Sequence, residues 1–571
     1  MGIPGFFGWL LRKYDKNTFT AFKLNTSIDE LYIDANCMLH PSCFKILKNA
    51  LSSLSNEKLE DEMITMCLRD LDYLIKYVNP TKQIFIAVDG VAPLAKISQQ
   101  RKRRYKSYDE TQRKNIIKQK YGVSLPHSWT NASITPGTIF MEKLHRRIIA
   151  FLKELPQKCQ IIYSSYHTAG EGEHKIFAHI RKEKHIPVTR VIYGLDADLI
   201  FLAMACNTQK LFLIREETEF KGRREQTSSS QHDVFTYVSI DTLINCFNEQ
   251  VFDLLVNRSL SGTPCKRPIQ KNNTNDIIFI CYFLGNDFVP HVPSIDIKKY
   301  GMDMLLDAYG KAYMNNTSSL INYNEEDTQV NVLFLNDFLS YLVTSEKDYF
   351  TKKEEIAVNR IQHFESPCDE ELWKLDNMKI IKSSDIFQKH IGTFDDWKFR
   401  YYSHHFHTTE SQEITIRNIC KNYIDGIMWI TKYYFNGCQS WNWVYEYQCA
   451  PFVSDLNKFM QTYHYNVNEL QFELGQPIPA VIQLLCVIPK QYSYLLPDKY
   501  AELMNDTSSI GDMFPSNYIL DTCNKDQFWQ CNPILPILNM NRILNTTQHM
   551  TVIPYIEIIN KILQNIVFTN T

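Results

Sequence analysis

The chain has 571 residues, of which 44% are hydrophobic and 22% charged, which predicts folded domains and excludes a disordered chain. The 61 basic and 63 acidic residues leave a net charge of −2, which excludes a globally basic nucleic-acid-binding surface but not a local basic patch. No apolar run approaches the roughly 18 residues of a membrane span, and the 15 cysteines contain no C-x-x-C pair, which argues against a zinc ribbon and for reduced thiols inside a cell.

Short apolar runs alternate with segments of helical periodicity up to residue 215. This alternation predicts an α/β fold with a parallel sheet, whose ligands bind beyond the carboxyl ends of the strands. The predicted strands are residues 28–36, 83–90, 159–166, 190–197 and 209–215. The predicted helices are residues 57–78, 96–120 and 142–155, and another begins at Glu171 to Glu173.

Beyond residue 215 the pattern changes. Residues 216–234 and 254–275 are polar and are predicted to be surface loops, whereas 276–285 predicts a buried helix followed by Gly285-Asn286-Asp287. From about residue 330 helical segments dominate, and the clearest of them is 413–436.

Seven carboxylates lie at or just after hydrophobic elements of this plan. A single acid in such a place is usually a helix cap or a solvated strand end. Acids at several neighbouring strand ends would repel one another unless a cation were bound between them. Oxygen ligands without Cys or His favour Mg²⁺ or Mn²⁺, and two such ions roughly 4 Å apart are suited to phosphodiester hydrolysis. The candidate catalytic and metal-binding residues are Asp34, Asp89, Glu171, Glu173, Asp196, Asp198 and Asp287.

A basic helix follows Asp89. Residues 96–106 contain six basic side chains and no acid, and helical spacing places Lys96, Gln100, Arg103 and Arg104 on one face. In isolation this pattern is typical of a solvated basic helix. Beside a metal site, however, the same lysine and arginine side chains suit a terminal phosphate.

Aromatic side chains are the third candidate group. His40 lies six residues after Asp34, and Trp441 and Trp443 lie in the second half. Rings beside a metal site can stack unpaired bases at roughly 1–3 kcal/mol each, although a lone tryptophan is more often part of a core.

These residues stand in motifs that resemble the 5′→3′ exoribonucleases of the Xrn/Rat family. The first half resembles the first conserved region of that family, in order and in spacing. The second half resembles its second conserved region, and the resemblance covers about residues 1–550. The matching segments are GIPGFFGWL (2–10), LYIDANCMLH (31–40), AVDGVAPLAKISQQRKRR (87–104), ITPGTIFM (134–141), AGEGEHKI (169–176), YGLDADLI (193–200), FLGNDFVPH (283–291), DDWKFRYY (395–402), the block 440–452, FELGQP (472–477) and FWQCNPILPIL (528–538).

The resemblance implies an α/β nuclease core similar to flap endonucleases and PIN-type nucleases, with a mostly helical second region packed over the active site. The corresponding domains are 1–325, the nuclease core, and 326–571, which closes the RNA channel. All seven acids match metal-binding positions of the family, for two Mg²⁺ ions with Mn²⁺ as a substitute. The departures at Cys37, Met38 and Tyr447-Gln448-Cys449 affect none of these acids.

The resemblance also assigns roles in substrate binding. Lys96, Gln100, Arg103 and Arg104 match the pocket for a 5′-monophosphate, and Pro93 matches a residue that excludes duplexes. His40 and a tryptophan of the second region match the rings that stack on the bases; we favour Trp443 over Trp441 and leave both open.

We therefore expect a processive 5′→3′ exoribonuclease that degrades single-stranded, 5′-monophosphorylated RNA, such as decapped mRNA, to nucleoside 5′-monophosphates. We expect a monomeric, core-only member that does not bind membranes. It would receive RNA from the decapping machinery in the cytoplasm, which would be a host cytoplasm if the protein is viral. The alternatives are a flap-type structure-specific DNA endonuclease and a catalytically inactive RNA-binding scaffold.

Overall fold

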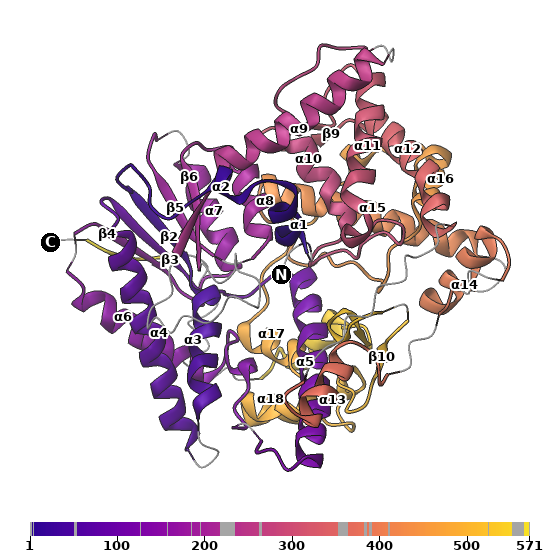
Figure 1. Ribbon diagram of the computed structural model, residues 1–571. Coiled ribbons are helices and arrows are strands. Elements are labelled where there is room, and N and C mark those ends of the chain that lie inside the picture. Colours follow the sequence, from indigo (N-terminus) through magenta and orange to yellow (C-terminus); the bar gives the residue numbers. More distant parts are fainter. Residues whose placement is uncertain are drawn as a thin grey trace.

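The computed structural model describes residues 3, 5–50, 54–125, 127–156, 158–183, 186–194, 196–216, 235–261, 265–351, 364–381, 385–387, 391–408, 412–523, 525–550 and 565–569. Its central element is a sheet of eight strands in the order β1-β7-β6-β5-β2-β3-β4-β12 (Figure 1). The strands are β1 (Thr20–Ala21), β2 (Glu30–Asp34), β3 (Gln83–Ala87), β4 (Gln160–Ser164), β5 (Arg190–Tyr193), β6 (Leu211–Glu216), β7 (Phe235–Ser239) and β12 (Ile566–Phe568).

The centre of this sheet is parallel, as the sequence predicts. Strands β2, β3, β4, β5 and β6 pair in parallel, in a continuous register from Glu30 opposite Gln83 to Asp34 opposite Ala87. The prediction of an α/β fold is therefore confirmed. The sheet edges add antiparallel strands that the sequence pattern did not predict: β7 and β1 on one side, and β12 beside β4 on the other.

Helices cover both faces of the sheet, so its strands are nearly continuous apolar runs. Successive strand residues alternate between two cores: Tyr32 and Phe85 face the core around α7 and α8, whereas Ile33 and Ile86 face the core around α3, α4 and α6. The helices of this half are α1 (Phe6–Lys13), α2 (Lys16–Phe19), α3 (Ala35–Asn49), α4 (Asn56–Val78), α5 (Leu94–Lys120), α6 (Ile139–Glu154), α7 (Gly172–Lys182), α8 (Asp198–Ala205), α9 (Ile240–Leu260) and α10 (Thr274–Cys281).

One predicted loop is wrong. Residues 254–260 belong to α9, whose buried Val251 and Leu255 continue the apolar stripe of the helix into that segment. The polar side chains between them lie on the other faces of the helix, and their polarity is why the sequence predicted a loop there. The predicted loop 216–234 lies, beyond Glu216, outside the described residues.

The second half of the chain is mostly helical and gathers on the side of the molecule away from β4 and the C-terminus (Figure 1). Its core is continuous with the core of α8 and α10, since Trp429 and Leu456 belong to the same buried cluster as Phe201 and Ile278. Its elements are α11 (Gly301–Asn315), β8 (Ile321–Asn322), β9 (Gln329–Val330), α12 (Val332–Thr351), α13 (Pro367–Asp376), α14 (Phe394–Phe406), α15 (Glu413–Phe435), α16 (Val453–Tyr463), α17 (Ala480–Val487), α18 (Asp498–Ala501), β10 (Ile519–Asp521), β11 (Asn532–Ile534) and α19 (Met540–Thr547).

The second half of the chain contacts α5 at its start and again at Arg101. The backbone N–H of Ala92 donates to Oε1 of Gln483 at 2.8 Å, and the N–H of Leu94 donates to the carbonyl of Trp441 at 2.9 Å. Farther along the helix, the buried guanidinium of Arg101 donates to the carbonyls of Met513 and Pro536. Arg101 is therefore a packing residue that fixes α5 against the end of the chain.

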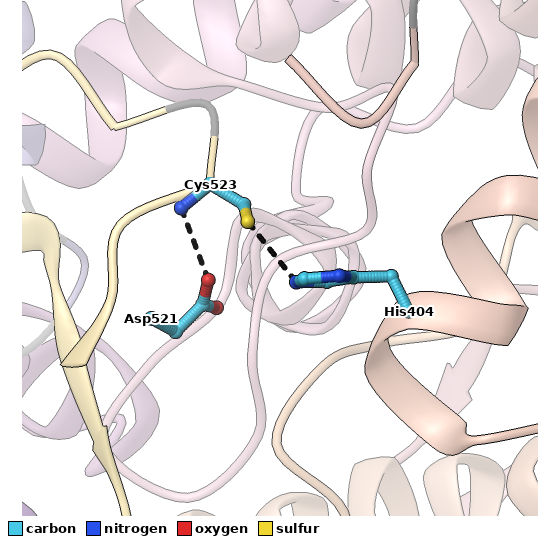
Figure 2. Close-up of side chains that lie close together, drawn as sticks. All are labelled: His404, Asp521 and Cys523. Atoms are coloured by element: carbon cyan, nitrogen blue, oxygen red, sulfur yellow. Dashed lines mark hydrogen bonds between the residues drawn. The ribbon is translucent and has the colours of Figure 1, made fainter. Parts of the chain in front are cut away.

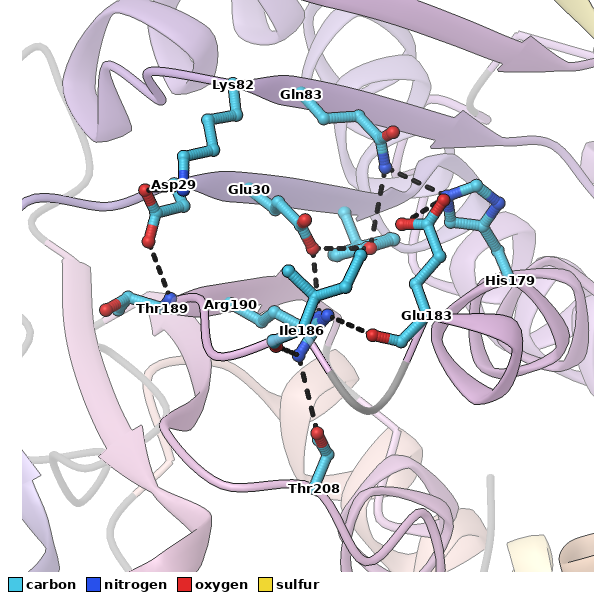
Figure 3. Close-up of polar contacts among 11 residues, drawn as sticks. Asp29, Glu30, Lys82, Gln83, His179, Glu183, Ile186, Thr189, Arg190 and Thr208 are labelled. Carbon is cyan, nitrogen blue, oxygen red and sulfur yellow. Dashed lines mark hydrogen bonds and ion pairs between the residues drawn. The ribbon is translucent and has the colours of Figure 1, made fainter.

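The amino ends of the central strands are closed by a buried polar network (Figure 3). Nε of Arg190, the first residue of β5, donates to Oε2 of Glu30, the first residue of β2, at 2.9 Å. The same guanidinium donates to the carbonyls of Glu183 and Ile186, and the Tyr32 hydroxyl donates to Glu30 at 2.8 Å. The charges at this edge are thus satisfied by the protein itself.

Within the part of the chain that the structure describes, no helix is both long enough and apolar enough to span a bilayer.

Candidate active site

Six of the seven predicted acids stand at the carboxyl ends of the central strands. Asp34 is the last residue of β2, and Asp89 lies two residues beyond β3. Glu171 is the N-cap of α7 and Glu173 lies in its first turn, as expected for acids at a helix start. Asp196 lies in the turn after β5. Asp198 is the first residue of α8, so it belongs to a helix start and not to the strand predicted over residues 190–197.

Asp287 comes from the other side, after the short 3₁₀ turn Tyr282–Leu284. The side chain of Asn286 accepts hydrogen bonds from the backbone of Phe288 at 2.9 Å and Val289 at 3.1 Å, which fixes the turn. Gly285 has φ +80°, and a Cβ there would lie 2.4 Å from the backbone nitrogen of His291. Only glycine fits, so this turn presents Asp287 in one orientation.

Gly172 shows how close the acids lie. A Cβ at this position would meet Oδ1 of Asp34 at 2.8 Å and Oδ1 of Asp89 at 3.3 Å. Its backbone N–H donates to Oδ1 of Asp89 at 2.6 Å. A glycine between Glu171 and Glu173 is therefore what allows the start of α7 to approach the ends of β2 and β3.

Burial and mutual repulsion raise the pKa values of Asp34, Glu171, Glu173 and Asp198. Burial, and then the charge of Asp89, raise the pKa of Asp34 to about 8. Burial, and then the charge of Asp198, raise the pKa of Glu173 well above its ordinary value. Since each acid acts electrostatically on the next, the structure does bring the predicted set together around one place.

The ammonium of Lys96 stands among the acids. It forms ion pairs with Glu171 and, at 2.8 Å, with Oδ2 of Asp287. Burial works against the charged form, yet the pKa of Lys96 is raised because Asp287 and Glu171 outweigh that effect. The same ammonium lowers the pKa of Asp287, against the opposite effect of burial. Lys96 thus reaches the acid site from the first turn of α5.

The donor set fits a hard divalent cation. Oδ1 of Asp34, Oε2 of Glu173 and Oδ1 of Asp198 are buried and make no hydrogen bond. Buried carboxylate oxygens without partners are costly unless they are protonated or neutralised by a cation, and all the donors are oxygens. Among the described residues, however, no three of the acids bring ligand oxygens within 4.8 Å of one another. The seven side chains surround the site without being drawn together.

The other predicted phosphate ligands follow Lys96 along α5. Gln100 is buried, and Arg103 and Arg104 are half-buried. Nε of Arg104 and Oε1 of Gln100 are buried without a hydrogen-bond partner. Burial, and then the charge of Arg103, lower the pKa of Arg104 to about 9. The charges of these two half-buried guanidinium groups repel each other, and an anion bound by both would relieve that repulsion.

His40 lies close enough to Arg103, Arg104 and Asp196 for their charges to act on it. Burial, then Arg103 and Arg104, lower its pKa to about 3, while Asp196 acts in the opposite direction. The ring is therefore neutral at physiological pH, which suits stacking on a base. Pro93 is buried as the N-cap of α5, where the site meets the second half.

The two candidate tryptophans take different places. The ring of Trp443 stacks on Trp429 at 5.2 Å between centroids, and its edge lies against Gly426, where a Cβ would be 2.9 Å away. Trp441 is held by its backbone between Leu474 and Leu94. Both indoles are half-buried, so the choice between them stays open.

Two residues at the site were missed by sequence reasoning. Lys175 donates to the carbonyls of Val88 at 2.8 Å and Ser165 at 2.9 Å, and so ties together the loops that carry the acids. Its place in the motif with Glu171 and Glu173 could have indicated it. The Tyr433 hydroxyl donates to Oε1 of Glu171 at 3.0 Å from a position 262 residues away, and no local pattern could have revealed that contact.

A parallel α/β sheet with an oxygen-only cluster of acids at the carboxyl ends of its strands, covered by a helical half, defines a nuclease-type domain of the PIN kind. Comparison with known families agrees. The model described as "XRN 5'-3' exonuclease N-terminus" matches residues 1–217, and the model described as "Xrn1 helical domain" matches residues 270–391 and 392–553. This chain belongs to the XRN 5'-3' exonuclease family, which is metal-dependent.

Similar curated proteins carry the same description. The chain is 28% identical to human 5'-3' exoribonuclease 1 over 96% of its own length and 34% of that protein. It is 26% identical to 5'-3' exoribonuclease 1 of Schizosaccharomyces pombe, over 95% of this chain and 48% of the relative. For the 5'-3' exoribonuclease 2 homolog of Drosophila melanogaster, the identity is 28%, over 98% and 71%. The chain spans less than half the length of the first two relatives.

Proposed function

We propose that this chain is a processive 5′→3′ exoribonuclease that hydrolyses single-stranded RNA with a 5′-monophosphate and releases nucleoside 5′-monophosphates. Two Mg²⁺ ions, or Mn²⁺ in their place, would be held by Asp34, Asp89, Glu171, Glu173, Asp196, Asp198 and Asp287. Supply of RNA by decapping enzymes, a monomeric state and action in the cytoplasm remain predictions, as does the domain boundary at residue 325.

The observation that carries the proposal is the position of α5. Its first turn places Lys96 in contact with Glu171 and Asp287, and two turns later it carries Arg103 and Arg104. At 1.5 Å per residue those groups are about 10 Å apart along the helix. Since the lysine and arginine side chains are long and can lean towards each other, a terminal phosphate held by the arginines would leave a neighbouring phosphodiester close to the acids. Hydrolysis there would release a mononucleotide.

In this mechanism the metal ions, when bound, would supply an activated water and charge stabilisation for the leaving 3′-oxygen. The protein's part is to position the ions and the RNA. The Gly285 turn fixes Asp287, the hydroxyl of Tyr433 orients Glu171, and Lys175 holds the loops of Asp89 and Glu171 together. The neutral ring of His40 would stack on the first bases between the arginines and the acids.

The test is to degrade matched RNAs that carry a 5′-monophosphate, hydroxyl, triphosphate or cap, with Mg²⁺ present. We expect rapid loss of the monophosphorylated RNA alone. Arg103→Ala should slow its degradation about 10- to 100-fold, the cost of one charge-assisted contact, and bring it towards the hydroxyl RNA. The matched control is Arg113→Ala on the same helix, where the arginine is paired with Asp109 at 2.6 Å and is remote from the acids.

Three outcomes would contradict the proposal. If Arg103→Ala slows both RNAs equally, the helix binds the RNA backbone and not the terminus. If a single-stranded DNA flap is cut in preference to RNA, the endonuclease alternative holds. If every RNA is bound and none is cut with either metal, the chain is an RNA-binding scaffold.

The second half should also control which substrates enter. Because Trp441, Tyr433 and Gln483 contact the elements of the acid site, we expect a circular RNA to resist cleavage and a stable hairpin to stall degradation. Trp443→Ala or Trp441→Ala, whichever removes the stacking ring, should weaken RNA binding by about 1–3 kcal/mol. Binding is measured with a non-cleavable RNA, and the thermal unfolding of both variants shows whether either change merely loosens the fold. Cleavage of the circle would rule out threading through a closed channel.

A further inference from the structure

A cluster of metal-ligand side chains lies outside the acid site, where α14 meets the hairpin of β10 and β11. His404 lies in the last turn of α14, Asp521 is the last residue of β10, and Cys523 follows two residues later (Figure 2). One ligand atom from each of the three lies within 4.8 Å of the other two, and Nε2 of His404 is 3.0 Å from Sγ of Cys523. In the described chain, a group this tight recurs only in the adjoining trio of His405, Cys449 and Asp521.

The separations suit a tetrahedral ion. Zinc lies about 2.3 Å from a thiolate and about 2.0 to 2.1 Å from an imidazole nitrogen, so two such ligands are about 3.6 Å apart. The pair His404 and Cys523 needs to open by only a fraction of an ångström to reach this spacing. The carboxylate of Asp521 is already oriented, because its Oδ1 accepts the backbone N–H of Cys523 at 3.1 Å.

We propose that His404, Asp521 and Cys523 bind one Zn²⁺ ion. A thiolate and an imidazole select zinc over the magnesium expected at the oxygen-only acid site. Cys523 is buried whereas His404 is exposed, so the fourth position faces solvent and takes a water molecule. No C-x-x-C motif indicates this site in the sequence, because His404 lies more than a hundred residues before Asp521 and Cys523.

The neighbouring trio serves as support. Nδ1 of His405 lies 3.8 Å from Oδ2 of Asp521, and Cys449 reaches the same carboxylate. Carboxylate ligands in metal sites are commonly held in this way by outer partners. The charge of Lys525 acts on both His405 and Cys449. A zinc ion with one thiolate and one carboxylate is neutral overall, so the site fits beside that lysine.

The ion would tie two parts of the second half together. Helix α14 is fixed to the core of Phe452 through Trp397 and Tyr402. The segment that connects β10 and β11 carries Trp529, whose carbonyl accepts a hydrogen bond from Lys106 of α5 at 2.6 Å. Zinc at their junction would hold the hairpin against α5. Its contribution is to stability and not to the chemistry of the acid site.

The experiment is to purify the full chain under reducing conditions without added zinc chelators and to measure its metal content by mass spectrometry. We expect about one zinc ion per chain. Removal with a chelator that prefers zinc, in excess Mg²⁺, should lower the unfolding temperature. Refilling with Co²⁺ should give the thiolate charge-transfer and visible bands of a tetrahedral site. Neither readout requires RNA hydrolysis, so this proposal and the exoribonuclease proposal can fail separately.

Two variants and one control complete the test. Cys523→Ser and Asp521→Asn should each weaken zinc binding by at least about 100-fold, beyond the usual effect of an outer partner. Cys531→Ser, a buried thiol of the same hairpin that contacts Met378 instead, should keep the ion. The proposal is overturned if the purified chain takes up no stoichiometric zinc or cobalt. It is equally overturned if Cys531→Ser loses the ion as fully as Cys523→Ser does, because binding would then be spread over the thiols of the chain.

Discussion

The two ends of the central sheet both carry buried charge, and the fold treats that charge in opposite ways. At the amino ends of β2 and β5, Glu30 and Arg190 neutralise each other and every guanidinium nitrogen has a partner. At or just beyond the carboxyl ends of the same two strands, Asp34 and Asp198 each have a buried carboxylate oxygen without a hydrogen-bond partner. The three residues between Glu30 and Asp34 thus separate a closed structural network from an open site. The cost of the open end indicates that something other than stability maintains it.

The largest expected effect is at the open end. Asp198→Ala should abolish hydrolysis of 5′-monophosphate RNA, because the loss of a metal oxygen removes several kcal/mol of transition-state stabilisation. RNA binding and the thermal stability of the metal-free chain should survive, since no folded-state partner of Oδ1 is lost. Single-turnover rates are compared with those of Asp72→Ala on α4, a half-buried acid paired with the exposed Lys76. Activity within about tenfold of the unaltered chain would remove the metal assignment.

The converse change is at the closed end. Arg190→Ala leaves the carboxylate of Glu30 buried and uncompensated, and should lower the free energy of unfolding by about 3–5 kcal/mol. Denaturant titration measures this loss. Lys82→Ala removes the exposed partner of Asp29 at the same edge, 3.1 Å away, and should cost about 0–1 kcal/mol. If Arg190→Ala destabilises the chain no more than Lys82→Ala, the buried pair of Arg190 and Glu30 contributes no more to stability than an exposed pair, and the contrast between the two ends of the sheet fails.

A further effect is a pH dependence of the metal-free chain. The pKa of Asp34 is raised from 3.8 to about 8 by burial and by Asp89. Between those values the folded state holds a proton that the unfolded state releases, so the stabilisation present at low pH is lost as the pH rises. The unfolding temperature in chelator should therefore fall between about pH 5 and 8. Asp34→Asn should flatten this fall, and an unchanged slope in that variant would show that other groups cause it.

The open end of the sheet could be predicted from the sequence because its signal is local. Apolar runs that end in Asp34 and Asp89 define both a strand and the position of a carboxylate, and they needed no knowledge of distant contacts. The spacing of Lys96, Gln100, Arg103 and Arg104 likewise required only helical periodicity. Strand pairing then brings the strand ends together, since carboxyl ends of parallel strands share one edge.

What the sequence did not predict depends on distant pairs. Arg190 reads as an ordinary strand start until it meets Glu30, 160 residues earlier. Tyr433 reads as part of an amphipathic helix until its hydroxyl meets Glu171. The antiparallel edge strand β12 comes from the last residues described. The sequence pattern did not predict the end of α9, because the polar faces of that helix obscured its buried apolar stripe. These features follow from tertiary packing, which one-dimensional periodicity does not contain.

The hydrogen bonds that fix the start of α5 have a consequence in time. The backbone N–H of Ala92 cannot form its hydrogen bond until Gln483, 391 residues downstream, has been synthesised. At roughly 5–20 residues per second, a ribosome needs on the order of tens of seconds to make that partner. Late in this interval strands β1 to β7 and the seven acids have already been made, but the start of α5 lacks this contact. Synthesis order thus separates the formation of α5 from its attachment to the second half of the chain.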